Sequence, residues 1–154
     1  TGCYNRLYLN KVVEPSINFQ SSITSVMLDI DYFKSINDNY GHHSGDEVLK
    51  ELSKSIKKII PNSGKLFRYG GEEFLEIVQG ETEESINLLV DSLLLSPLSL
   101  RETVTFSLRE NVTVSIGVTY CERTNGSIDE LIEAADRALY LSKRGGRNRV
   151  TWCD

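Results

Sequence analysis

Apolar and polar residues alternate from Ile23 to Asp31, a segment rich in β-forming residues. Because successive side chains of a strand point to opposite faces, this pattern predicts a β-strand with two distinct faces. One face carries Val26, Leu28 and Ile30, and the other carries Met27, Asp29 and Asp31. Two carboxylates therefore share one side of the strand at its C-terminal end.

Three other segments are predicted to be helices. The first begins at Val48, the second spans 81–95 and the third follows Ser127. Ser44 and Glu47 form a capping-box pattern at the start of the first helix, and Ser127 with Glu130 forms another at the third. The second helix is expected to end at Pro97, which cannot continue it. The apolar face of the third carries Ile128, Leu131, Ile132, Ala135, Ala138 and Leu139.

Further strands are predicted at 66–69, 74–78 and 112–119. Gly70 and Gly71 join the first two, and a glycine pair in a short connection permits the positive φ angles of a tight hairpin. The order is then strand, helix, hairpin, helix, strand, helix. This order, with mixed strand pairing, favours an α/β (α+β) fold in sheet-and-helix layers.

The composition is that of one globular domain. The chain has 154 residues, 40% of them apolar and 25% charged, which excludes a disordered, fibrous or membrane-embedded protein. Its net charge of −5 argues against nucleic-acid binding, which needs a basic face. No apolar run reaches the roughly 18 residues of a spanning helix, so no membrane contact is expected. Three distant cysteines favour a reducing cytosol over a disulfide scaffold or zinc site.

Four acidic residues are candidates for a metal site. Asp29 and Asp31 end one strand, and Glu72 and Glu73 follow the glycine turn of a hairpin that could pair with it. If these strands pair, four like charges converge at one edge of the sheet, and a divalent cation would relieve their repulsion. Hard oxygen ligands select Mg²⁺. Alternatively, each acid is simply solvated at a strand end.

Candidate phosphate-binding residues lie after the acidic strand and near the C-terminus. The sequence has no P-loop motif. Lys34 leads into a helix start near Ser35, where free backbone N–H groups favour anions. Lys143 and Arg147 are four residues apart at the exit of the last helix, so both could point the same way. Alternatively, these two cations only complement the helix dipole.

The segment from Asn37 to Asp46 is dense in turn-forming residues. It is either a plain connection between two helices or a base-recognition segment. A carboxylate accepts hydrogen bonds from the N1–H and N2–H₂ edge of guanine, and an asparagine amide both donates and accepts. Asp46 and Asn37 are therefore candidate guanine ligands.

Several blocks of the sequence resemble the GGDEF family of diguanylate cyclases. The blocks are Thr1-Gly2 with Asn5-Arg6, Asp29 to Lys34, Asn37-Asp38 with Gly41-His42 and Gly45-Asp46, Arg68 to Phe74, Val112 to Gly117, Ala135 to Tyr140, and Gly146 to Arg149. The signature stands at 70–74 in its GGEEF form. Because the blocks follow the family's order over nearly the whole chain, residues 1–154 resemble a single GGDEF domain. The chain begins without an initiator Met, which suggests a domain cut from a longer protein.

The resemblance implies a central five-stranded mixed sheet wrapped by helices, akin to the palm of nucleotidyl cyclases and polymerases. The implied reaction condenses two GTP into cyclic di-GMP and two pyrophosphates in the bacterial cytoplasm, with Mg²⁺ or Mn²⁺ as cofactor. One domain binds one GTP, so a homodimer is needed, and an N-terminal sensory or receiver domain, which could tether the protein to a membrane, is expected to enforce it. The alternative is a non-catalytic GGDEF-like module that binds GTP or cyclic di-GMP as a receptor.

The resemblance also implies a role for particular residues. The implied metal ligands are Asp29, the Ile30 carbonyl and Glu72. The implied catalytic residues are Glu72 as general base, Lys34 as a stabiliser of phosphate charge, and Glu73, which either orients the hairpin or serves a second metal. The implied substrate-binding residues are Phe33, Asn37, His42, Asp46, Lys143 and Arg147, with Asn37 and Asp46 reading guanine and the last two holding the triphosphate. Because these residues are present, catalysis is favoured over the receptor alternative.

Many relatives carry a product-binding Arg-x-x-Asp motif five residues before the signature, but this chain has Pro61 to Gly64 there. The guanidinium is replaced by proline and the carboxylate by glycine, so the charge-assisted hydrogen bonds of a tight anion site are lost. We therefore expect no high-affinity product site at this position.

Overall fold

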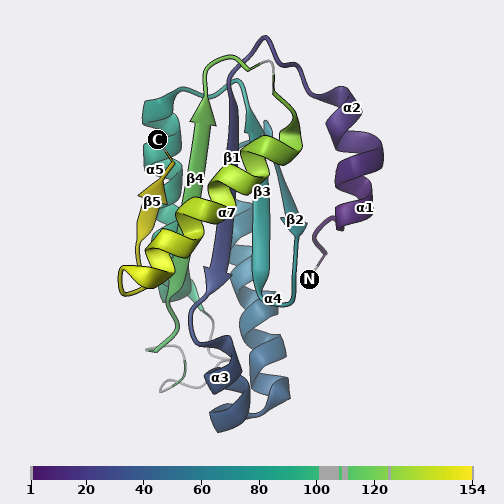
Figure 1. Cartoon of the computed structure of the whole chain (residues 1–154). Helices are drawn as coiled ribbons and strands as arrows, with labels where there is room; N and C mark the ends of the chain where they lie inside the picture. Colours follow the sequence, from purple (N-terminus) through teal and green to yellow (C-terminus); the bar gives the residue numbers. More distant parts are fainter. Residues whose placement is uncertain (1, 101–107, 109–110, 125, 154) are drawn as a thin grey trace.

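A computed structural model describes residues 2–100, 108, 111–124 and 126–153 of the chain. It contains a five-stranded sheet in the order β2-β3-β1-β4-β5, with helices on both faces (Figure 1). The strands are β1 (Ile23–Ile30), β2 (Gly64–Arg68), β3 (Glu73–Gln79), β4 (Val114–Cys121) and β5 (Val150–Trp152). The helices are α1 (Arg6–Tyr8), α2 (Glu14–Ser16), α3 (Phe33–Tyr40), α4 (His42–Ile59), α5 (Glu83–Leu94) and α7 (Ile128–Arg144), with a π-helical stretch at Leu9–Val13 and a 3₁₀ turn at Ser96–Ser99. The predicted fold class is confirmed.

The central strand β1 pairs antiparallel with both β3 and β4, and β2 pairs antiparallel with β3. The short strand β5 pairs parallel with β4, which makes the sheet mixed. At the C-terminal end of β1, Asp29 lies opposite Glu73, and Ile30 lies opposite Val114. The end of β1 therefore meets the starts of both of its neighbours at one edge of the sheet.

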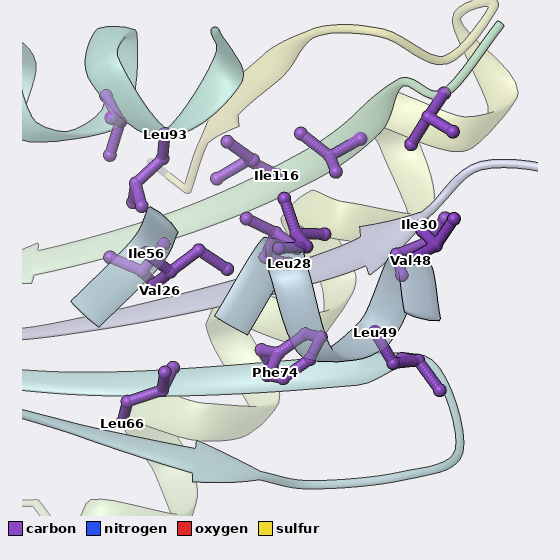
Figure 2. Packing of buried hydrophobic residues seen from close by; sticks show 14 of the residues in the cluster. Val26, Leu28, Ile30, Val48, Leu49, Ile56, Leu66, Phe74, Leu93 and Ile116 are labelled. Atoms are coloured by element: carbon purple, nitrogen blue, oxygen red, sulfur yellow. The ribbon is translucent and has the colours of Figure 1, made fainter. Parts of the chain in front are cut away.

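The two faces of β1 belong to two separate hydrophobic clusters, as the alternation predicts. Val26, Leu28 and Ile30 pack against residues of α4 and α5 on one face (Figure 2). Met27 packs on the other face with residues of α7 and of the N-terminal helical segment. Because Asp29 and Asp31 have the same parity as Met27, they fall on the face covered by α7.

The backbone of helix α7 lies close against Gly117 of β4. A Cβ atom on Gly117 would lie 2.1 Å from the Ala135 carbonyl oxygen and 2.2 Å from the Leu139 backbone nitrogen. Both contacts are to helix backbone, which has no flexible side chain to move aside. Glycine at this position therefore sets the distance between α7 and the sheet.

Several predicted boundaries are wrong. Helix α4 begins at His42 rather than after the predicted capping box, because Gly41, at a φ of +88°, forms the break between α3 and α4. Strand β2 runs from Gly64 to Arg68, and β4 begins at Val114. The capping box of α7 is confirmed on one side, since the Ser127 side chain accepts a hydrogen bond from the Glu130 N–H at 3.3 Å. In the described part of the chain, no helix combines the length and apolar character needed to cross a bilayer.

The ionisable side chain of Glu76 in β3 lies in the core. It shares the strand face of Phe74 and Val78, which belong to the cluster beneath α4, and it is 2% exposed. Neither carboxylate oxygen has a hydrogen-bond partner among the described residues. Burial without a partner raises the pKa of Glu76 from 4.5 to about 8. The carboxyl group is thus kept neutral by its surroundings, at a cost to stability that grows as the pH rises.

We expect Glu76→Leu to stabilise the domain, most strongly at pH 8. The folded-state pKa of Glu76 lies above its unfolded-state value, so the folded protein holds this proton more tightly. The stability that this proton contributes is fully present below about pH 4.5 and is lost as the pH rises through 8. At roughly 1.4 kcal/mol per pKa unit, the gain at pH 8 is a few kcal/mol and shrinks toward pH 5. Urea unfolding at several pH values measures it. Glu133→Leu, at an exposed position of α7, is the control, and an equal gain at pH 5 and pH 8 would contradict the explanation.

Candidate active site

The turn between β2 and β3 lies against the end of β1. The Ile30 N–H donates a hydrogen bond to the Glu72 carbonyl at 3.3 Å, and Asp29 is paired with Glu73. Arg68 braces the turn, because its Nε and Nη2 groups donate to the Gly71 carbonyl at 3.2 and 2.7 Å. The predicted pairing of the acidic strand with the glycine hairpin is therefore confirmed.

The Asp29 carboxylate is 4% exposed and divided between two environments. Its Oδ2 atom forms an ion pair with the Lys143 Nζ of α7, whereas its buried Oδ1 atom has no hydrogen-bond partner in the described structure. Burial raises the pKa of Asp29 from 3.8 to about 6, Lys143 opposes that rise, and the charges of Glu72 and Glu73 add to it. The Asp29 carboxylate therefore has one oxygen that is neutralised by a cation and one that is buried without a partner.

The acidic residues predicted to meet at this edge lie near one another, since Asp29 is paired with Glu73 and the charges of Glu72 and Glu73 both act on it. Among the described residues, no group of three or more His, Cys, Asp or Glu side chains could hold a metal ion. Asp31 is held by hydrogen bonds instead, because its carboxylate accepts from Thr113 Oγ1 at 2.7 Å and Ser115 Oγ at 2.6 Å. The roles of Asp29, the Ile30 carbonyl and Glu72 as metal ligands stay predictions.

Two cations approach the same end of β1 from α7. The Ser142 hydroxyl donates to the Ile116 carbonyl at 2.8 Å and so fixes the last turn of α7 to β4. The next residue, Lys143, reaches Asp29. Arg147 lies beyond the helix, and its guanidinium carbon is 4.5 Å from the centroid of the Tyr32 ring. Both cations therefore contact residues at or just after the end of β1, as their spacing suggested.

The predicted nucleotide-binding residues occupy α3 and the start of α4, which follow β1 directly. Phe33 and Asn37 face Gly45, where a Cβ atom would lie 1.9 Å from Asn37 Oδ1 and 3.2 Å from Phe33 Cζ. The remaining members, Lys34, His42 and Asp46, are exposed. The structure thus places the Asn37 side chain beside Gly45, while the roles of all five residues stay predictions.

Two residues that shape the site, Arg68 and Tyr32, were given no role by sequence reasoning, and Asp31 was predicted as a metal-site acid and not as a link between segments. Arg68 braces the turn, Asp31 links β4 to the end of β1, and Tyr32 carries Arg147. A signal existed for Asp31, since Thr113 and Ser115 lie on the polar side of the alternating segment at 112–119. For Tyr32 the local sequence offers none, because its partner is 115 residues away.

Comparison with known proteins gives consistent matches. The family model described as "Diguanylate cyclase, GGDEF domain" matches residues 1–149. Diguanylate cyclase A of Treponema denticola is 40% identical over 132 residues, covering 86% of this chain and 35% of that protein. The GGDEF domain of DgcB from Caulobacter crescentus, solved in complex with c-di-GMP, superposes with a TM-score of 0.88 at 32% identity, covering 100% of this chain and 90% of that one.

A second solved structure, the active GGEEF domain of a diguanylate cyclase from Vibrio cholerae, has a TM-score of 0.83 at 27% identity. It covers 100% of this chain and 99% of that one. The chain spans about a third of the length of the Treponema relative. The similarity therefore concerns one domain of such proteins.

We expect Lys143→Met to raise the pKa of Asp29 above its value of about 6 in the metal-free protein. The substitution removes the cation whose hydrogen bond and charge favour the ionised carboxylate, while burial of Asp29 is retained. The pH titration of the Asp29 carboxyl ¹³C signal measures the shift. Arg144→Met is a matched control on the next residue, and an unchanged Asp29 pKa in Lys143→Met would refute the ion pair.

A second prediction concerns Gly45. Alanine there should destabilise the domain by about 1–3 kcal/mol through crowding with Asn37. In an Asn37→Ala background the same change should cost less, because the contact with Asn37 Oδ1 is gone, alanine is about 1 kcal/mol better than glycine inside a helix, and only the 3.2 Å contact with Phe33 remains. Urea unfolding of the four proteins of this double-mutant cycle measures the coupling. Additive effects would show that Asn37 does not occupy the space at Gly45.

Proposed function

Because this chain belongs to the GGDEF family of diguanylate cyclases, we propose that it condenses two GTP into cyclic di-GMP with release of two pyrophosphates. The observation that carries the proposal is the Asp29 carboxylate. One of its oxygens is paired with Lys143, the other is buried without a partner, and the Glu72 turn lies alongside.

The proposed cofactor is Mg²⁺, with Mn²⁺ as a substitute. The residues present fit such an ion, since a buried, unpartnered carboxylate oxygen and a nearby carboxylate are the hard ligands that it prefers. Asp29, Glu72 and the Ile30 carbonyl would hold it. When bound, the ion would lower the pKa of a coordinated hydroxyl and neutralise charge on the phosphates.

The chain's own residues would act by proton transfer and electrostatic stabilisation. Glu72 would take the proton of the 3′-hydroxyl whose oxygen attacks the α-phosphorus of the second GTP. A phosphorus–oxygen bond forms there, and the bond to the leaving pyrophosphate breaks. Lys34, Lys143 and Arg147 would stabilise the charge on the phosphates, and positioned cations of this kind account for most of phosphoryl-transfer catalysis.

Asn37 and Asp46 are proposed to read the guanine, with Phe33 and His42 beside them and Glu73 orienting the turn. Each domain would bind one GTP, so two domains must face each other for the two reciprocal attacks. We further propose that residues 1–154 act as one GGDEF unit of a longer protein whose N-terminal sensory or receiver region brings two copies together in the bacterial cytoplasm.

The test is to fuse the chain to a dimeric coiled coil, incubate it with GTP and Mg²⁺, and assay cyclic di-GMP by mass spectrometry. We expect product from the dimerised chain and much less from the unfused one. A dimer that binds GTP but makes no product would favour the alternative of a nucleotide-binding receptor.

We expect Asp29→Asn and Glu72→Gln, made in the dimerised chain, to abolish synthesis with the fold intact. Each removes an anionic oxygen ligand but also relieves like-charge repulsion, so stability should hold or rise slightly. Product formation and thermal unfolding are measured together. Glu81→Gln, which lies two residues beyond the far end of β3, is the control, and near wild-type synthesis in either site variant would exclude that residue as a metal ligand.

A further inference from the structure

The loop that follows α7 is held by the first residue after β1. Asp31 is 3% exposed, and its Oδ2 atom accepts a hydrogen bond from the Asn148 N–H at 3.0 Å in addition to the Thr113 hydroxyl. Its Oδ1 atom accepts from Ser115, and its own N–H donates to the Thr113 carbonyl at 2.9 Å. One buried carboxylate thus joins three segments of the chain.

The loop needs such support because its backbone is strained. Arg147 and Asn148 have φ angles of +65° and +48°, so two consecutive residues other than glycine adopt the left-handed conformation. Each such residue costs on the order of 1 kcal/mol or more unless its surroundings enforce it. Two further bonds support the turn: the Arg147 N–H donates to the Ser142 carbonyl, and the Arg149 Nε donates to the Arg147 carbonyl, both at 3.0 Å.

Tyr32, the residue after Asp31, contacts the Arg147 side chain of the same loop. The Tyr32 ring lies 4.5 Å from the Arg147 guanidinium carbon, and the Tyr32 hydroxyl lies 3.5 Å from Arg147 Nη1. Tyr32 is 63% exposed and also left-handed, with a φ of +53°. The ring is therefore presented to Arg147 on the surface and not packed in the core.

We infer that Asp31 and Tyr32 are positioning residues that hold Arg147, through its backbone and its side chain respectively, in the orientation that receives a triphosphate. This inference rests on the proposed function, in which Arg147 binds the triphosphate of GTP. Asp31 fixes the strained loop, and Tyr32 confines the guanidinium by a cation–π contact. A cation fixed in advance loses less conformational entropy when the anion binds.

The experiment uses the whole chain and readouts that need no turnover. The variants are Tyr32→Leu, which removes the ring, Tyr32→Phe, which keeps it, and Asp31→Asn. Tyr140→Leu is a matched control, because it removes an exposed tyrosine that contacts Arg144 in the same way, with the guanidinium carbon 5.8 Å from the ring centroid. Calorimetry with inorganic triphosphate and Mg²⁺ gives affinity, and the ¹⁵N relaxation of Arg147 Nε, assigned with Arg147→Lys, gives side-chain order.

We expect Tyr32→Leu and Asp31→Asn to weaken triphosphate binding about three- to tenfold and to increase the mobility of Arg147 Nε. Tyr32→Phe should stay within about twofold of wild type, since the ring face is kept. In the dimerised chain, the KM for GTP should rise more than kcat falls. Tyr140→Leu should leave Arg147 order and triphosphate affinity unchanged.

The inference would be overturned if Tyr32→Leu left triphosphate affinity and Arg147 order unchanged, or if Tyr140→Leu lost as much affinity. It would also be overturned if the wild-type chain did not bind triphosphate. If Asp31→Asn fails to fold, the exposed Tyr32 variants still decide. Failure to synthesise cyclic di-GMP would contradict the proposed function and not this inference, because triphosphate affinity and Arg147 order are measured without catalysis.

Discussion

The contact between the backbone of α7 and Gly117 of β4 is the constraint on which the rest of the site depends. A Cβ atom there would lie 2.1 Å from the Ala135 carbonyl oxygen, so any other residue would move the helix away from the sheet. The Ser142 hydroxyl then fixes the last turn of the helix to β4. Because both anchors are to the strand beside β1, the Lys143 side chain arrives at Asp29 and the following loop arrives at Asp31.

Unfavourable features are concentrated at this one edge of the sheet. A buried carboxylate with an unpartnered oxygen and a left-handed residue at Tyr32 lie at the end of β1, and the two left-handed residues of the loop are bound to it through Asp31 and Tyr32. Strain and unpartnered polar atoms persist where the surroundings enforce them, and they are common at functional sites. Away from this edge, Glu76 is buried and unpartnered among apolar residues beneath α4, and the buried hydroxyls of Ser25 and Thr119 also have no hydrogen-bond partner among the described residues.

Much of the fold could be predicted because its signals are local. The alternation in β1 assigned its two faces correctly, and the capping residue of α7 marked its start. The start of α4 was misplaced because a positive φ at Gly41, and not a side-chain cap, separates α3 from α4. Within the site, the strand pairing that brings Glu72 to Asp29 was anticipated. The hydrogen bonds of Asp31 to Thr113, Ser115 and Asn148 were not anticipated, because these partners lie 82 to 117 residues away.

The antiparallel pairing of β1 with β4 also gives the domain two ends of different character. Asp29 and Ile30 stand at one end, whereas Ile23 lies opposite Cys121 at the other. At about 3.3 Å per residue, seven residues separate these ends by roughly 23 Å. The turn that precedes β1, at Gln20 to Ser22, is therefore remote from the carboxylates. A fluorescent protein inserted in this turn would mark the position of the domain in living cells and would lie away from the nucleotide proposed to bind near Asp29.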